Sequence, residues 1–121
     1  MVDLGLQNKH CVPCEGTEKP FTREQVARYM PGLSLAWDVI DGKKLRHTFR
    51  FKDFVQAMAF VNRIAPVAEA EGHHPDIHIY YGRVMIEFWT HVIGGLSEND
   101  FILAAKIEFL SGNGNGKTAS S

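Results

Sequence analysis

The order of hydrophobic and polar residues divides the chain into alternating helical and extended segments. Apolar residues recur at helical spacing over residues 21–30, 52–72 and 96–110, which predicts three amphipathic helices. Apolar and polar residues alternate over residues 35–51 and again over residues 77–88, which predicts two β-hairpins. The predicted order is therefore helix, hairpin, helix, hairpin, helix.

Capping and turn residues support these boundaries. Thr22 and Gln25 form a capping-box pattern at the start of the first helix. Asp41-Gly42 predicts a two-residue turn in the first hairpin, and Gly82-Arg83 predicts one in the second. Each hairpin is thus expected to have a short connection and a fixed register.

The middle helix has an apolar stripe that predicts which face is buried. Pro66 falls inside the pattern, so we expect a kink or loosened last turns, and Gly72 is a plausible end of the helix. The residues expected to face the core are Phe54, Met58, Val61 and Ala65.

Helices with one apolar stripe need a sheet to cover. The pattern therefore predicts an α+β fold in which a four-stranded antiparallel sheet carries three helices on one face. Residues 1–19 are polar and contain glycine and proline, which indicates a loop-like N-terminal arm before a domain at residues 20–111. The glycine-rich residues 112–121 are expected to form a disordered tail.

Composition and charge exclude several classes of function. A chain of 121 residues with 45% hydrophobic residues suits one domain. A net charge of −1 does not favour a nucleic acid or an anionic membrane as partner. No apolar run predicts a transmembrane helix or a signal peptide, so we expect a cytoplasmic protein. Cys11 and Cys14 are too few for a disulfide scaffold or a four-cysteine zinc site.

Four of the six histidines lie between residues 71 and 91, which raises three alternatives: metal ligands, a proton-transfer site, or ordinary sheet residues. His73 and His74 are adjacent, and Pro75 favours extended backbone before it, so the two side chains are expected to point to opposite faces. That geometry argues against one shared metal ion. A rigid pair of imidazoles can instead hold a proton donor and a proton acceptor. Glu69 could orient an imidazole or take a proton itself.

The remaining histidines give weaker signals. His10 and His47 stand alone, and His78 is flanked by isoleucines on an alternating strand. For these three, partly exposed structural residues are the simpler interpretation.

The chain resembles the pterin-4a-carbinolamine dehydratase family (4a-hydroxytetrahydrobiopterin dehydratase) over about residues 21–110. The similarity rests on residues in an unbroken register: Glu69, His73-His74-Pro75, Thr90-His91 and Gly95-Leu96-Ser97 followed by Asp100. Trp37 matches the family's tryptophan before the first turn. The segment "KHCVPCEG" resembles the arm of bacterial members, and its role is open.

The resemblance implies a dehydratase that removes water from 4a-hydroxytetrahydropterin to give quinonoid dihydropterin by histidine general acid–base catalysis. His73 would be the main acid–base group, His74 would contact the pterin or assist, and His91 would be the second proton-transfer group. Glu69 would orient His73. Three residues would bind substrate: Pro75, Trp37 and Asp100. A place in the core explains Trp37 equally well. Asp100 is also explained structurally, because Ser97 and Asp100 form a capping-box pattern for the last helix.

The resemblance also implies partners and leaves two alternatives. It implies no metal and no organic cofactor, a homodimer or homotetramer, and a functional link to an aromatic amino acid hydroxylase. One alternative is a relative that acts on another pterin, such as one of the molybdenum cofactor pathway. The other is a protein-binding role, because animal members bind the dimerisation segment of a homeodomain transcription factor through a helix face.

Overall fold

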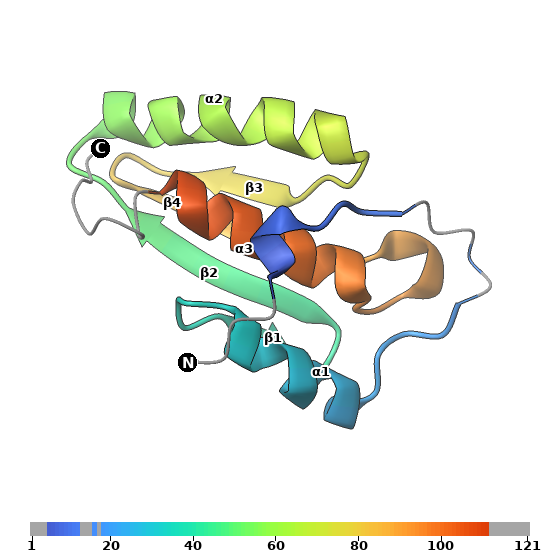
Figure 1. The fold of residues 1–121 in the computed structure, drawn as a ribbon. Helices are drawn as coiled ribbons and strands as arrows, with labels where there is room; N and C mark the ends of the chain where they lie inside the picture. Colours follow the sequence, from blue (N-terminus) through green and yellow to red (C-terminus); the bar gives the residue numbers. More distant parts are fainter. Residues whose placement is uncertain (1–4, 13–15, 17, 112–121) are drawn as a thin grey trace.

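Four antiparallel strands form the sheet in the computed structural model of the chain, which describes residues 5–12, 16 and 18–111 (Figure 1). The strands are β1 (Asp38–Ile40), β2 (Lys44–Arg50), β3 (Asp76–Ile79) and β4 (Arg83–Phe88), in the order β1-β2-β4-β3. The two hairpins join at the centre, where β2 and β4 pair from Leu45 opposite Phe88 to Arg50 opposite Arg83. The predicted four-stranded antiparallel sheet is confirmed.

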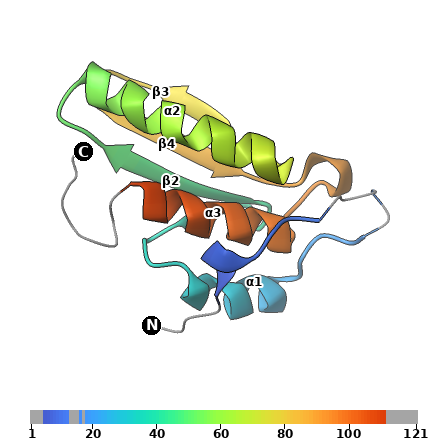
Figure 2. The same cartoon turned by 45° about the horizontal axis from the view of Figure 1, so that its top comes forward.

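Three helices lie on one face of this sheet (Figures 1 and 2), which confirms the predicted α+β architecture. They are α1 (Arg23–Tyr29), α2 (Phe54–Glu71) and α3 (Glu98–Leu110). The described residues also form three short 3₁₀ helices: η1 (Leu6–Asn8), η2 (Met30–Gly32) and η3 (His91–Ile93). The capping box of α1 is present as predicted, because Thr22 and Gln25 each bond to the other's backbone N–H.

The core lies between the sheet and the helices. Phe60 of α2 is fully buried, and its ring lies 4.8 Å from that of Phe49 and 5.0 Å from that of Phe51. Burial of one such side chain contributes roughly 1.5–3 kcal/mol to folding. These contacts hold α2 against the sheet and so determine where its C-terminal end meets the sheet.

The buried stripe of α2 differs from the predicted one. Phe54 is 48% exposed, so the predicted core face points partly to solvent. This helix carries two sets of apolar residues at helical spacing, the predicted one and a second one. The second set is the one that packs against the sheet. The residues that face the core are Ala57, Phe60, Ile64 and Ala68.

The end of α2 sets the direction of the following chain. The helix continues past Pro66 to Glu71, so the predicted loosening of its last turns is wrong. It ends as predicted at Gly72, which has a φ of 67° and donates its backbone N–H to the carbonyls of Ala68 and Glu69. This left-handed residue turns the chain sharply, and His73 follows directly.

Both hairpin turns differ slightly from the predictions. In the first, Ile40 pairs with Lys44, so the loop has three residues; Asp41 and Gly42 have φ of 54° and 69°. In the second, the Tyr80 backbone N–H donates to the Arg83 carbonyl at 2.9 Å, which places Tyr81-Gly82 at the tip. The sheet register is nevertheless the one that the alternating pattern requires.

The described part of the N-terminal arm packs against α3. Leu6 of η1 is 1% exposed and packs in the core cluster with residues of α3. Because η1 covers the outer side of α3, this helix is buried on several faces rather than along one stripe. The predicted tail at residues 112–121 lies outside the described residues, as does Cys14. None of the helices in the described part of the chain is long and apolar enough to cross a membrane.

Candidate active site

One pocket of about 630 Å³ gathers the histidines that the sequence singled out. It lies where the C-terminal end of α2, the start of β3, the chain after β4, the first turn of α3 and the N-terminal arm meet. Its wall includes Glu69, His73, His74, Pro75 and His91. The fold therefore brings together all four residues predicted to be catalytic, with Pro75 beside them.

His73 pairs with a buried carboxylate. Its Nε2 lies 2.6 Å from Oδ1 of Asp100, and the imidazole side chain is 13% exposed whereas that of Asp100 is fully buried. The ring also stacks over Phe88 with an interplanar angle of 10°. His73 is thus held in one orientation at the edge of the pocket by one polar and one apolar contact.

Asp100 is the centre of a small hydrogen-bond network. Its Oδ2 accepts the Thr90 hydroxyl at 2.8 Å and the Ser97 backbone N–H at 2.9 Å. Thr90 has one hydroxyl proton, so the Ser97 hydroxyl, 2.8 Å away, is the donor in their mutual bond. These bonds compensate the burial of the carboxylate. Asp100 therefore both caps α3, as the sequence indicated, and holds His73.

Glu69 holds a different imidazole from the one predicted. Its Oε2 lies 2.7 Å from Nε2 of His74, so the prediction that Glu69 orients His73 is wrong. The physical reason is the extended backbone before Pro75, which points the two imidazoles in opposite directions. The side chains of His74 and Glu69 are 57% and 77% exposed, so this pair contributes little to stability.

His91 enters the pocket from the first residue of η3. Its ring lies 4.1 Å from that of Trp89, and the ammonium of Lys44 lies over Trp89, 5.1 Å from the ring centroid. Trp89 also lines the pocket. The alternating pattern did not single out this tryptophan, although its place two residues before His91 was a usable signal.

Trp37 lies apart from the pocket residues. It is 5% exposed, packs against Phe49 and Phe88, and donates its indole N–H to Oε2 of Glu108 at 2.7 Å. Glu108 is itself buried and also accepts the backbone N–H groups of Ser34 and Leu35. This arrangement places Trp37 in the core rather than in the pocket wall where the resemblance expected it.

The other histidines take structural positions. His47 Nδ1 lies 3.0 Å from the Ala36 carbonyl oxygen, and His78 lies 3.5 Å from a carboxylate oxygen of Glu87 on the open face of the sheet. Burial alone would raise the pKa of Glu87, but the Arg46 guanidinium bonded to it lowers that pKa below its usual range. Among the described residues, no group of three or more His, Cys, Asp and Glu side chains is arranged to hold a metal ion.

Besides Trp89, the sequence did not predict that Cys11, Val12, Glu71 and Asn99 would line the pocket. Burial, followed by the nearby charges of Glu71 and Asp100, raises the pKa of the Cys11 thiol to about 12, so the thiol is protonated at neutral pH. Burial would raise the pKa of Glu71, but the Cys11 backbone N–H, His10 and Lys106 together lower it. The pocket thus contains a neutral thiol and an ionised carboxylate beside its histidines.

Comparisons with known proteins found relatives that align with most of the chain. A relative from Chlorobaculum tepidum is 47% identical over 108 residues, covering 87% of this chain and 96% of its own. One from Nitrosospira multiformis is 48% identical over 105 residues, covering 87% and 91%. Both carry the name "Putative pterin-4-alpha-carbinolamine dehydratase".

Two solved structures are similar in fold. A transcriptional coactivator/pterin dehydratase from Brucella melitensis has a TM-score of 0.70 and 30% identity, covering 76% of this chain and 98% of its own. A pterin dehydratase-like protein described as a RuBisCO assembly factor in the alpha-carboxysome has a TM-score of 0.56 and 25% identity, covering 65% and 93%. The family model described as pterin 4 alpha carbinolamine dehydratase matches residues 19–110, and the chain belongs to this family.

Proposed function

We propose that the protein is a dehydratase that converts a 4a-hydroxytetrahydropterin to the quinonoid dihydropterin and water. The observation that carries this proposal is the pairing of His73 with the buried carboxylate of Asp100 at the edge of a pocket that also contains His74 and His91. An imidazole held in one orientation by a carboxylate is suited to proton transfer. Membership of the family supports the class of substrate.

The reaction needs two proton transfers and no change of oxidation state. The bond between carbon 4a and the hydroxyl oxygen breaks, and the departing oxygen gains a proton to leave as water. A ring nitrogen loses its proton, and its electron pair forms the new carbon–nitrogen double bond. General acid–base catalysis of such steps contributes about 10²–10⁴ in rate.

The geometry favours His73 as the proton acceptor. An ionised Asp100 accepts the Nε2–H of a neutral imidazole, and this tautomer leaves Nδ1 as a base. His91 lines the same pocket and would deliver the proton to the hydroxyl. His74 is more exposed and would contact the pterin, with Glu69 orienting it. The reaction as proposed needs neither a metal nor an organic cofactor.

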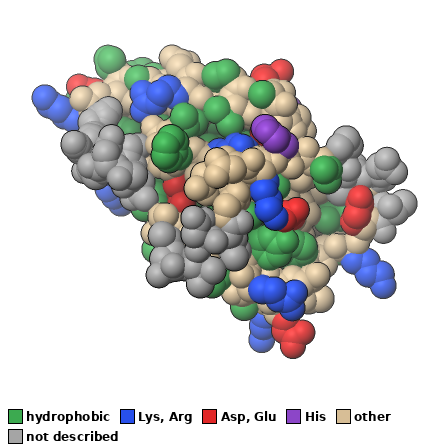
Figure 3. Space-filling view, in the orientation of Figure 1, with side chains coloured by type: hydrophobic (Ala, Val, Ile, Leu, Met, Phe, Trp, Pro, Cys, Tyr) green, Lys and Arg blue, Asp and Glu red, His purple; other side chains and the backbone are tan. Residues whose placement is uncertain are grey.

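The cellular setting follows from the chemistry. The carbinolamine arises when an aromatic amino acid hydroxylase uses its pterin, so we propose a functional link to such an enzyme in the cytoplasm. Hydrophobic side chains reach the surface along α2 (Figure 3), where Phe54 is 48% and Val55 is 74% exposed. This surface supports the proposal of a homodimer or homotetramer.

A protein-binding role is the second candidate. It is favoured by the two similar structures, one described as a transcriptional coactivator and the other as a RuBisCO assembly factor. The exposed side chains of Phe54 and Val55 offer a contact surface for a partner. Val55→Asp should change the assembly or partner binding and spare dehydration, because Val55 lies outside the pocket.

A kinetic assay tests the proposed activity. A phenylalanine hydroxylase generates 4a-hydroxytetrahydropterin in situ, and its loss is followed by absorbance with and without the protein. We expect faster loss with the protein, and the same rate with protein that was treated with a metal chelator and freed of it before the assay. Decay no faster than in buffer, from folded protein, would reject this activity. Competition by other pterins, including those of the molybdenum cofactor pathway, then identifies the preferred substrate.

A further inference from the structure

The N-terminal arm contributes a wall of the candidate active site. Cys11 and Val12 line the pocket that contains His73, His74 and His91, although more than sixty positions separate the arm from these histidines in the sequence. Cys11 is half-buried, and Val12 is 66% exposed. An exposed valine beside a polar pocket leaves apolar surface available to a flat ring.

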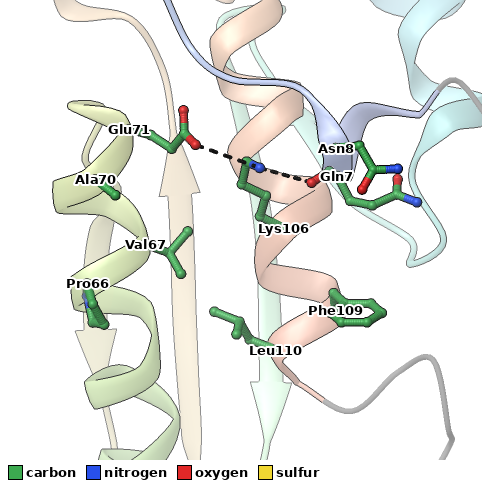
Figure 4. Close-up of a pocket in the computed structure, with 9 residues that line it drawn as sticks. All are labelled: Gln7, Asn8, Pro66, Val67, Ala70, Glu71, Lys106, Phe109 and Leu110. Carbon is green, nitrogen blue, oxygen red and sulfur yellow. Dashed lines mark hydrogen bonds and ion pairs between the residues drawn. The ribbon is translucent and has the colours of Figure 1, made fainter.

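Glu71 anchors the arm to the end of α2. One carboxylate oxygen accepts the Cys11 backbone N–H at 2.7 Å, and the other lies 2.8 Å from Nδ1 of His10. Lys106 of α3 lies 3.7 Å from the same carboxylate and donates to the Gln7 carbonyl at 2.9 Å (Figure 4). A chain of polar contacts thus joins α2, α3 and the arm behind the pocket.

Asn99 anchors the arm to the start of α3. Its side-chain carbonyl accepts the Val12 backbone N–H at 3.1 Å, and its amide donates to the Val12 carbonyl at 2.7 Å. Asn99 is 6% exposed. One buried amide therefore satisfies both backbone groups of Val12, which fixes the position of that residue over the pocket.

The two helix ends that hold the arm also hold the imidazoles. At α3, Asn99 bonds the arm and the next residue, Asp100, bonds His73. At the end of α2, Glu71 bonds the arm, and Glu69 bonds His74. The position of the arm relative to the imidazoles is therefore set by two short stretches of backbone.

We propose that Cys11 and Val12 form a substrate-contacting wall for the pterin ring, with Asn99 and Glu71 as positioning residues for that wall. This inference rests on the proposed dehydratase function and adds a binding element that lies before the 19–110 segment matched by the family. The wall offers a neutral thiol and an apolar side chain, so it contributes to substrate binding and not to proton transfer.

Three variants test the wall. Asn99→Ala removes the bonds to Val12, and Val12→Asp places a charge on an exposed side chain whose change should not affect folding. Lys9→Ala is the matched control, because Lys9 belongs to the arm but pairs with Glu98 outside the pocket. The readouts are KM and kcat for the carbinolamine and the Kd for 7,8-dihydrobiopterin.

We expect Asn99→Ala and Val12→Asp each to raise KM and Kd about tenfold, equivalent to about 1.4 kcal/mol of lost binding. Their kcat should stay near that of the wild type, and Lys9→Ala should change none of the three values. If the wild type is active and Val12→Asp leaves KM and Kd unchanged, the proposed wall is rejected and the dehydratase function stands. A Val12→Asp variant that loses only kcat would reject the wall in the same way. A wild type that neither binds nor dehydrates the pterin would overturn the proposed function and this inference with it.

Discussion

Replacing Asp100 with asparagine changes a single group in the network that holds His73. The amide keeps the shape of the carboxylate, and its oxygen can still accept the Thr90 hydroxyl and the Ser97 N–H, which both reach Oδ2. The other position becomes an NH₂ group that faces Nε2 of His73 at the former 2.6 Å contact. His73 must then accept at Nε2 and carry its proton on Nδ1, which removes the proposed base.

The expected loss is mainly in kcat. In serine proteases, the same exchange in a histidine–aspartate pair lowers kcat about 10⁴-fold through the wrong tautomer. General acid–base catalysis as a whole contributes about 10²–10⁴. We therefore expect Asp100→Asn to lower kcat by about 10²–10⁴ with a small change in KM. The free energy of unfolding should fall by about 1–3 kcal/mol, because a charge-assisted bond to a fully buried group is replaced.

Glu108→Gln is the matched control for this experiment. Glu108 is a second buried carboxylate of α3 and accepts three N–H groups, from Ser34, Leu35 and Trp37, away from the pocket. The Glu108→Gln variant should lose a similar amount of unfolding free energy and keep the kcat of the wild type. The assay is carbinolamine loss at saturating substrate, paired with urea unfolding. A folded Asp100→Asn variant with kcat within about threefold of the wild type would refute the role of the pair, since such a change is under 1 kcal/mol in barrier.

Three further predictions concern groups around this network. Trp37→Phe should cost about 1–3 kcal/mol of stability, measured by urea unfolding, through the lost bond to Glu108; a raised KM without loss of stability would instead place Trp37 in substrate binding. In a Cys14→Ser background, Cys11 should react with iodoacetamide about a thousandfold more slowly than a free thiol. The reason is that a pKa of about 12, against 9.0 for a free thiol, lowers the thiolate fraction by about three powers of ten. A rate like that of a free thiol would contradict the burial of Cys11. Glu71 has a lowered pKa in the folded protein, so its stabilising contribution is present above pH 4.5 and is lost as the pH falls below that value. The difference in unfolding free energy between wild type and Glu71→Gln should shrink over that acidic range, and a constant difference would count against this linkage.

The histidine cluster could be predicted because its residues lie close together in the sequence. The order of elements and the α+β architecture follow from periodicity, and His73, His74 and Pro75 follow from a short motif. Which carboxylate meets which imidazole could not be predicted. It depends on the left-handed turn at Gly72 and on the packing of α3, and both are tertiary properties.

The arm and the buried face of α2 were missed for different reasons. The arm is held by backbone groups that bond to Glu71 and Asn99, and such contacts leave no trace in a hydrophobic pattern. On α2, both stripes are apolar, so spacing alone cannot select Phe60 and Ile64 over Phe54. Trp37 was expected in the site because it matches the family's tryptophan before the first turn, and its bond to Glu108 places it in the core.

The most direct measurement compares His73→Ala with His78→Ala in the carbinolamine assay. Both variants remove an imidazole from neighbouring parts of one hairpin segment, but His73 lines the pocket and His78 pairs with Glu87 on the other face of the sheet. Circular dichroism confirms that each is folded. The account predicts that His73→Ala loses about 10²–10⁴ in kcat and that His78→Ala keeps the wild-type rate. Equal rates in the two variants would contradict His73 as the proton-transfer group.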